Sequence, residues 1–241
     1  MPTAVQRALA HARIKSKVAI ARVGRDSRRL DTIVNLPKIE TWRREHVPVG
    51  TPAFPDREDM YDHVHAELIG DQPIDYLEFG VFEGSSLRHW AELNTHPDSR
   101  FYGFDSFEGL PEEWKRFDRK IDKAHFDVQG ALPDIDDGRV TFVPGWFQES
   151  VDPFLDTFAP ARTPERQLVV HIDADLYSST LYVLTRLDAL LVPGTIVIFD
   201  EFSSVLNEFA ALEHYCSAYV REYDVLASAW HYFCQIAIRM R

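Results

Sequence analysis

The feature that most constrains this chain is an alternation of short apolar runs with helical segments between residues 74 and 200. Five runs are predicted to be strands: 74–79, 100–105, 140–143, 168–173 and 195–200. Segments between them, such as 85–93 and 178–191, carry apolar residues at helical spacing. Strands that alternate with helices predict right-handed crossovers and a mostly parallel α/β sheet with helices on both faces.

The C-terminal region departs from this alternation. A helix is predicted over 208–221, followed by strands at 223–229 and 232–239 that are joined only by Trp230 and His231. So short a connection requires an antiparallel pair. We therefore expect a seven-stranded sheet, mostly parallel, that ends in an antiparallel hairpin.

The N-terminal 70 residues have a different character. Prolines and a glycine break up residues 47–57, and Asp56 is placed to cap a helix that runs to about Ile69. We expect a helical or irregular cap or arm over residues 1–70 and one ligand-binding domain over residues 71–241, since a chain of 241 residues suits one large domain.

Charge limits the partners. Residues 1–45 carry eleven Lys and Arg against four Asp and Glu, so a net +7 there stands against −19 in residues 46–241, for a total of −12. The acidic body disfavours nucleic acid as a partner. The basic N-terminal segment is predicted to be a solvated helix or arm, or a surface for pairing of subunits.

The sequence also indicates a compartment. It contains no apolar run of roughly 18 residues that would span a membrane and no secretory leader. Only Cys216 and Cys234 occur, and their apolar neighbours predict buried free thiols rather than a disulfide. We expect a cytoplasmic protein that does not bind membranes.

A glycine-containing turn follows the first predicted strand. Gly80 and Gly84 allow the backbone to turn tightly near a ligand, and Ser85 or Ser86 is placed to begin the next helix with free N–H groups. Phe82 stands where the dinucleotide fingerprint requires a second glycine, which argues against NAD. A plain strand-turn-helix with a buried Phe is the alternative interpretation.

Asp105 ends the second predicted strand. A carboxylate at this place can accept from both hydroxyl groups of a ribose, which fits an adenosine ligand. Ser106 and Gly109 suit a turn equally well, so the other interpretation is that Asp105 caps that turn.

Four carboxylates follow the last two parallel strands: Asp173, Asp175, Asp200 and Glu201. Neighbouring strand ends bring them together, and no Lys or Arg lies between Asp173 and Arg186 or within 199–207. Like charges at about 4 Å repel by roughly 4 kcal/mol per pair at an effective dielectric of 20, so the cluster is expected to gain protons or to bind a cation. A hard divalent ion suits these oxygen ligands. The alternative is that some of the acids, such as Asp175, are helix caps or face solvent.

Several of these motifs together resemble the macrocin O-methyltransferase family of metal-dependent sugar and antibiotic methyltransferases. The resemblance covers roughly residues 74–202 and rests on five segments: 78–85, 104–111, 145–147, 172–180 and 193–201. It implies a Rossmann-like methyltransferase fold and S-adenosylmethionine as the cofactor. The antiparallel hairpin at the end of the chain is typical of that fold and not of the usual dinucleotide-binding dehydrogenase.

The resemblance implies a cofactor site. Glu78, Gly80 and Gly84 would hold the methionine part, and Asp105 would hold the ribose. The predicted cofactor-binding residues are Glu78, Phe79, Gly80, Gly84, Ser85, Ser86, Asp105, Ser106, Phe107 and Asp173.

The resemblance also implies a metal and a base. Asp173, Asp200 and Glu201 would bind Mg²⁺, and Asp175 would be the general base. The family commonly has Asp or Asn where this chain has Glu201, so the ion is shifted, or is Mn²⁺, or is bound by the two aspartates alone. His125 and His171 are further candidates for substrate contact, although a lone His is more often structural.

Two functions remain open from the sequence. The first is a metal-assisted O-methyltransferase that acts on a hydroxyl group of a small molecule: a sugar, a polyol or a natural-product diol. The second is a catalytically inactive protein that binds the cofactor with the same fold. A homo-oligomer formed through the N-terminal segment is a further expectation.

Overall fold

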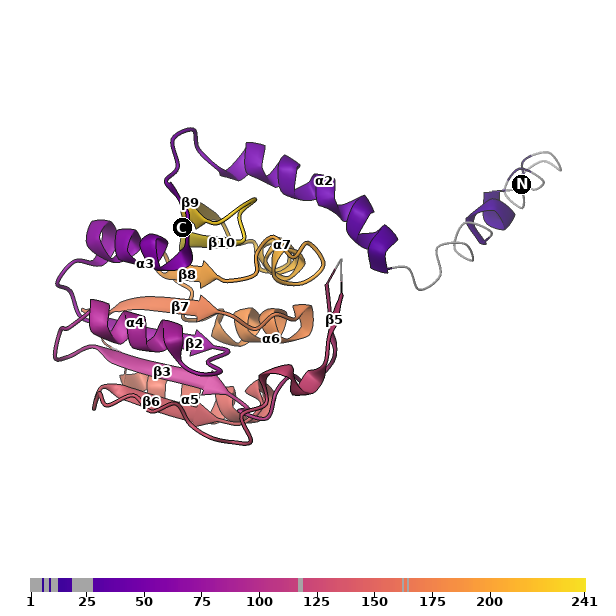
Figure 1. Cartoon of the computed structure of the whole chain (residues 1–241). Helices are drawn as coiled ribbons and strands as arrows, with labels where there is room; N and C mark the ends of the chain where they lie inside the picture. The colour runs from indigo at the N-terminus through magenta and orange to yellow at the C-terminus, as the bar shows by residue number, and fades with distance from the viewer. Residues whose placement is uncertain are drawn as a thin grey trace.

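The computed structural model describes residues 6, 9, 13–18, 28–116, 119–161, 163 and 165–241. Its centre is an eight-stranded sheet in the order β1-β9-β10-β8-β7-β2-β3-β6 (Figure 1). The strands of this sheet are β1 (Ala53–Phe54), β2 (Ile74–Phe79), β3 (Arg100–Asp105), β6 (Val140–Pro144), β7 (Gln167–Ile172), β8 (Ile196–Phe199), β9 (Tyr223–Ala229) and β10 (Gln235–Met240).

The strand pairing confirms the expected Rossmann-like fold. β6, β3, β2, β7 and β8 are parallel, and β10 is antiparallel to both β8 and β9. β1, which the sequence did not predict, adds an eighth strand parallel to β9, with Ala53 opposite Ser228. None of the described helices is long and apolar enough to cross a membrane.

Helices cover both faces of the sheet. They are α2 (Arg28–His46), α3 (Arg57–Val64), a π-helical turn (His65–Ile69), α4 (Ser85–Leu93), α5 (Phe147–Ala161), α6 (Tyr177–Leu187) and α7 (Glu208–Tyr219). α3 and α4 pack on one face. There the ring of Tyr61 in α3 contacts that of His171 in β7, and the ring of Trp90 in α4 stacks on that of Tyr76 in β2. α5, α6 and α7 pack on the other face.

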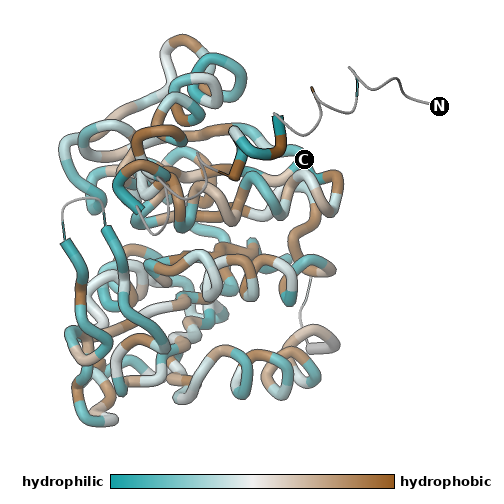
Figure 2. The backbone as a smooth tube through the Cα atoms, turned by 90° about the vertical axis from the view of Figure 1, so that its right-hand side faces the viewer, coloured by the Kyte–Doolittle hydropathy of each residue, from teal (hydrophilic) through white to brown (hydrophobic). Residues whose placement is uncertain are grey.

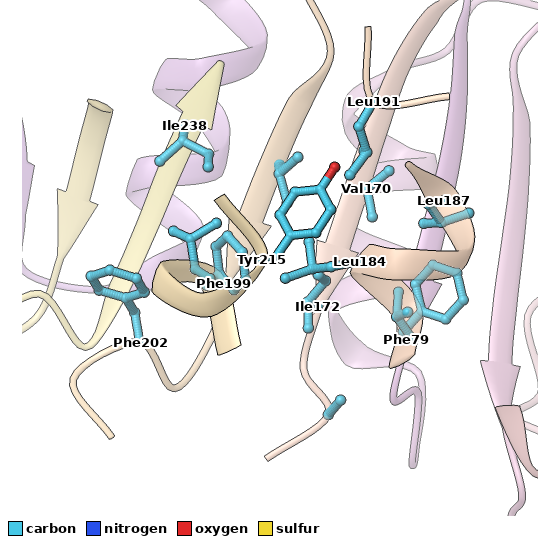
Figure 3. Packing of buried hydrophobic residues seen from close by; sticks show 14 of the residues in the cluster. Phe79, Val170, Ile172, Leu184, Leu187, Leu191, Phe199, Phe202, Tyr215 and Ile238 are labelled. Atoms are coloured by element: carbon cyan, nitrogen blue, oxygen red, sulfur yellow. The ribbon is translucent and has the colours of Figure 1, made fainter. Parts of the chain in front are cut away.

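Successive strand residues feed these two cores in turn. Tyr76 belongs to the core under α3 and α4, and the next residue, Leu77, belongs to the core under α5, α6 and α7, as the alternation of side chains along a strand requires. On the second face, Phe79 and Phe199 lie near Leu184 and Tyr215 (Figure 3). Full burial of one such side chain contributes about 2 kcal/mol.

α2 is attached to the C-terminal part of the domain through Trp42. The indole Nε1 of Trp42 donates to the hydroxyl group of Tyr223 at 2.7 Å, and its ring lies 4.8 Å from that of Phe202. Ile39 is also fully buried, whereas other apolar residues of α2, Ile33 and Val34 among them, are exposed. The helix therefore contacts the domain along one side only.

The C-terminal hairpin differs from the prediction in its connection. The prediction of a two-residue turn at Trp230 and His231 is wrong, because β10 begins at Gln235 and five residues separate the strands. Three of these, Trp230, Tyr232 and Phe233, have φ between 56° and 58°. Bulky residues rarely adopt this left-handed backbone, so their types gave no sign of the turn.

A long segment between β3 and β6 carries a small hairpin of its own. β4 (Trp114–Lys115) pairs antiparallel with β5 (Lys120–Ile121), and a 3₁₀-helix follows at Lys123–Phe126. The two arms of this hairpin are largely hydrophilic (Figure 2). Trp114 and Ile121 nevertheless pack on Leu176, which lies in the loop that follows β7. This contact places the hairpin over the carboxyl ends of the strands.

Candidate functional site

A cavity of about 360 Å³ lies at the carboxyl ends of β2, β3, β7 and β8. This is the edge at which ligands bind in open parallel sheets, and the volume lies in the range of small-molecule sites. Nine of the predicted site residues line it: Gly80, Ser85, Ser86, Asp105, Ser106, Asp173, Asp175, Asp200 and Glu201. The fold therefore gathers residues from four separate strand ends around one space.

The other predicted residues lie behind the cavity wall. Glu78 is fully buried and accepts from the hydroxyl groups of Tyr76 and Ser86, both at 2.7 Å. Phe79 is buried against Phe104, with the rings 4.5 Å apart. The other two, Gly84 and Phe107, have φ of 75° and 57° in the turns after β2 and β3.

Gly80 sets the distance between the turn after β2 and the end of β7. Its φ is +98°, and a Cβ atom there would lie 1.9 Å from the carbonyl oxygen of Asp173. Only glycine permits both the conformation and the approach. Gly80 thus brings the glycine-containing turn against the first of the clustered acids.

Asp105 holds the loops around it. Its Oδ2 accepts from the backbone N–H groups of Val81 and Phe82, both at 2.8 Å, and its Oδ1 accepts from that of Phe107 at 2.7 Å. Asp105 therefore does cap its own turn, as one sequence interpretation had it. The same carboxylate lines the cavity, and its Oδ1, which accepts one of these bonds, has a second lone pair with which to accept from a ligand.

The four carboxylates that the sequence grouped do converge, but they have cationic partners. Arg57 Nη1 lies 3.1 Å from Asp200 Oδ2 and 3.9 Å from Asp173 Oδ2. Arg116 Nη1 lies 3.6 Å from Glu201 Oε1. Neither arginine was predicted, because each comes from a distant segment. One sign was available: Arg57 is the single cation among the acids at the start of a predicted helix.

The positive charges do not neutralise the cluster. Burial and the charge of Asp200 raise the pKa of Asp173 well above its ordinary value. Burial and the charge of Glu201 do the same to the pKa of Asp175. Burial also disfavours ionisation of Asp200, yet the nearby imidazole of His171, whose Nε2 lies 3.7 Å from Oδ1, and the charge of Arg57 outweigh this and lower its pKa.

Asp175 is positioned by an unusual backbone. Its φ is 59°, and its side chain is 6% exposed at the cavity wall. α6 begins at Tyr177 with Leu176 at the capping position, so the sequence alternative of Asp175 as the cap of this helix is wrong. A left-handed non-glycine residue costs on the order of 1 kcal/mol, and such residues tend to cluster at functional sites.

His171 links two carboxylates below the cavity. Its Nδ1 lies 2.7 Å from the hydroxyl group of Tyr76, which donates to Glu78. Its Nε2 lies 3.3 Å from the hydroxyl group of Tyr61, which donates to Asp200 at 3.0 Å. Because each hydroxyl proton is given to a carboxylate, both ring nitrogens donate, which requires the charged form of His171.

The direction of the pKa of His171 agrees. Burial alone would lower it, but the nearby carboxylates of Asp200 and Glu78, each with an oxygen 3.7 Å from a ring nitrogen, raise it. His171 is fully buried and does not line the cavity, whereas His125 does.

The donor set fits a divalent ion in its chemistry. Asp173 and Asp200 offer carboxylate oxygens beside surplus negative charge, which hard cations prefer. In the part of the chain that the structure describes, no three His, Cys, Asp or Glu side chains are grouped closely enough to share an ion. Arg57 stands between the two aspartates, and Glu201 faces Arg116.

The comparisons with known proteins agree with this geometry. The macrocin-O-methyltransferase (TylF) family profile matches residues 41–230. The chain is 32% identical over 161 residues to 8-demethyl-8-(2,3-dimethoxy-alpha-L-rhamnosyl)-tetracenomycin-C 4'-O-methyltransferase of Streptomyces olivaceus, covering 58% of this chain and 57% of that protein. It is 27% identical to mycinamicin III 3''-O-methyltransferase of Micromonospora griseorubida, covering 58% and 59%. The chain thus spans somewhat more than half the length of these relatives.

Solved structures show the same fold. The O-methyltransferase NovP superposes with a TM-score of 0.54 at 23% identity, over 76% of this chain and 78% of that one. The calicheamicin methyltransferase CalS11 does so with a TM-score of 0.54 at 22% identity, over 89% and 93%. Because the family profile spans most of the described domain, this chain belongs to the macrocin O-methyltransferase family.

Proposed function

We propose that this protein transfers a methyl group from S-adenosylmethionine to a hydroxyl group of a small molecule, with assistance from Mg²⁺ or Mn²⁺. The observation that carries the proposal is that the Gly80 turn and Asp105 face the acids after β7 and β8 across the same cavity. One wall suits an adenosine donor, and the other suits the deprotonation of an acceptor. Membership of the family supports the same reaction.

The cofactor is proposed to lie along the first wall. The turn from Gly80 to Ser86 approaches the cavity closely because Gly80 has no side chain, and α4 begins there with free backbone N–H groups. Asp105 would accept from one ribose hydroxyl group through Oδ1 while it holds its own loops. Glu78 is buried and accepts from the hydroxyl group of Ser86. We therefore propose that Glu78 supports this wall and places a negative charge behind it.

Asp173 and Asp200 are proposed to hold the metal, with Glu201 as a third ligand. When bound, the ion lowers the pKa of an acceptor hydroxyl group. For Asp173 and Asp200 to serve as its ligands, Arg57 must give up its place between them. The 3.9 Å contact to Asp173 is weak, whereas the 3.1 Å pair with the buried Asp200 is a larger loss that the charge of the ion would have to offset.

Asp175 is proposed as the general base. It reaches the cavity from a left-handed turn, and its raised pKa makes it a stronger proton acceptor than an ordinary carboxylate. It would take the proton of the acceptor hydroxyl group as that oxygen attacks the methyl group. Burial of the site from water and correct placement of the two reactants would supply much of the rate.

For the acceptor we propose a sugar, a polyol or a natural-product diol. The name of the Streptomyces olivaceus relative includes a rhamnosyl group, and the names of both relatives give primed O-methylation positions. The cavity of about 360 Å³ has the size of a small-molecule site. We also propose that nucleic acid and membranes are not partners. The exposed apolar residues Ile33 and Val34 on α2 support pairing of subunits through the N-terminal segment.

Two measurements test the proposed function. Calorimetry should show binding of S-adenosylhomocysteine, and a panel of sugars and glycosylated natural products should accept labelled methyl groups from S-adenosylmethionine. Transfer should stop with EDTA and return with Mg²⁺. Asp175→Asn should lower kcat by about 100-fold or more while the affinity for S-adenosylhomocysteine stays unchanged. Binding of the cofactor without transfer to any acceptor would instead support an inactive cofactor-binding protein.

A further inference from the structure

A second cavity, of about 230 Å³, adjoins the first. It is bounded by the beginning of α2, the β4–β5 hairpin and the loop from 201 to 207. Arg116 and Glu201 line both cavities. The two cavities therefore share the wall that Arg116 and Glu201 form. A molecule that reacts beside Asp175 would have to pass this ion pair to extend into the second space.

Three cations line this second cavity against one acid. The cations are Arg28, Lys115 and Arg116, and the acid is Glu201, which already faces Arg116 at 3.6 Å. Such an excess of positive charge is unusual in a chain of net charge −12. It favours an anionic ligand and opposes a cationic one.

Arg28 is held in place by neutral groups. Its Nε donates to the carbonyl oxygen of Lys115 at 2.7 Å, and its Nη2 donates to Oδ1 of Asn207 at 2.8 Å. Neither acceptor carries a charge, and the two acids that act on Arg28 electrostatically, Glu112 and Asp31, lie outside the lining of the second cavity. Burial lowers the pKa of Arg28, which shows that water is partly excluded around it. A fixed, partly desolvated guanidinium group is a strong partner for a phosphate or a carboxylate.

Polar and apolar groups complete the lining. Thr32, Ser203 and Ser204 offer hydroxyl groups, and Leu36 and Leu206 offer apolar surface. The cavity thus joins an anion-binding end to neutral walls that suit the remainder of an organic molecule.

We propose that this second cavity binds an anionic group, a phosphate or a carboxylate, carried by the acceptor. The inference rests on the proposed function, and it narrows the acceptor to molecules with such a group some distance from the hydroxyl group that is methylated. Arg28 and Lys115 bind the anion, and Arg116 marks the passage between the two cavities.

The binding test uses the full chain loaded with S-adenosylhomocysteine. Calorimetry is carried out with inorganic pyrophosphate, with glucuronate and with methyl glucoside. The expected result is binding of at least one anion and none of methyl glucoside: pyrophosphate alone indicates a phosphorylated acceptor, and glucuronate alone a carboxylated one. Binding of neither anion to protein that holds S-adenosylhomocysteine overturns the inference and leaves the proposed function standing.

A matched pair of variants locates the anion. Lys115→Gln removes one cation of the second cavity, whereas Lys120→Gln removes the residue that faces it across the same hairpin and lines neither cavity. We expect Lys115→Gln to weaken anion binding about fivefold or more, with no change for Lys120→Gln. Both variants should bind S-adenosylhomocysteine as the wild type does. An equal loss in both variants would mean diffuse attraction to the surface and would overturn the assignment.

Discussion

The Nη1 atom of Arg57 lies 3.1 Å from Oδ2 of Asp200, and this pair joins the start of α3 to the end of β8. The same guanidinium group reaches Oγ of Ser85 at 3.3 Å through its Nη2. Arg57 thus contacts residues of both walls of the cavity. Its position makes it a competitor for any cation that Asp173 and Asp200 bind.

Arg57→Gln should strengthen the binding of a divalent ion. Removal of a positive charge from between Asp173 and Asp200 leaves their oxygens uncompensated, and we expect about tenfold tighter binding of Mn²⁺, measured by calorimetry without substrate. Arg44→Gln is the matched control, because Arg44 is exposed on α2 and pairs with Glu40. Equal affinities in the two variants would place the ion away from Arg57.

Gly80→Ala should destabilise the fold much more than Gly130→Ala. Both glycines have positive φ, but a Cβ atom at Gly80 would meet the Asp173 carbonyl oxygen at 1.9 Å, whereas one at Gly130 meets nothing within 4 Å. We expect a loss of about 1 kcal/mol for Gly130→Ala from backbone strain alone and at least about 3 kcal/mol for Gly80→Ala. Urea unfolding measures both. Similar losses would mean that the turn after β2 can move away from β7.

Glu208→Gln should stabilise the protein at alkaline pH. Glu208 is fully buried and its Oε2 accepts from the backbone N–H of Glu201, while its Oε1 has no hydrogen-bond partner. Burial raises the pKa of Glu208 well above 4.5. The folded state therefore holds a proton that the unfolded state has released, and the free energy of unfolding falls as the pH rises from about 4.5 through the folded pKa.

The variant cannot ionise, so it escapes this loss. We expect Glu208→Gln to exceed the wild type by about 1 kcal/mol at pH 8 and to show no gain at pH 4, with Glu67→Gln, an exposed site, as the control. Urea unfolding at the two pH values is the measurement. A gain of the same size at both pH values would contradict a role for ionisation.

The two thiols should react slowly in the folded protein. Burial raises the pKa of Cys216 and of Cys234 to about 12, so almost no thiolate exists at pH 8. Alkylation by iodoacetamide at pH 8, followed by mass spectrometry, should be more than about 100-fold slower than in urea. A folded protein that labels as fast as the unfolded chain would show that these side chains are accessible and ionised.

The sheet was predictable because its strands are short runs made mostly of apolar residues. β7 and β8, for example, are buried over nearly their whole length, and a run of this kind predicts a buried strand whichever helices pack on it. The convergence of Asp173 and Asp200 followed for the same reason, because parallel strands that lie side by side end at the same edge.

The partners of those acids were not predictable in the same way. Arg57 and Asp200 are 143 positions apart, and nothing in a local pattern says which side chain of an N-terminal helix reaches a strand end. The β4–β5 hairpin has only two residues in each strand, too few to show a period of two. Both features depend on tertiary packing, which local patterns do not record.

β1 has a consequence for the behaviour of the chain before and after folding. Its two residues lie beside β9, where the N–H of Ser228 donates to the carbonyl oxygen of Pro52 and that of Trp230 donates to the carbonyl oxygen of Phe54, both at 3.0 Å. These bonds occupy amide groups that would otherwise offer a template to strands of other molecules. A chain in which the segment before α3 has not yet docked presents an open sheet edge, and it is at that stage that aggregation during synthesis or refolding is most to be expected.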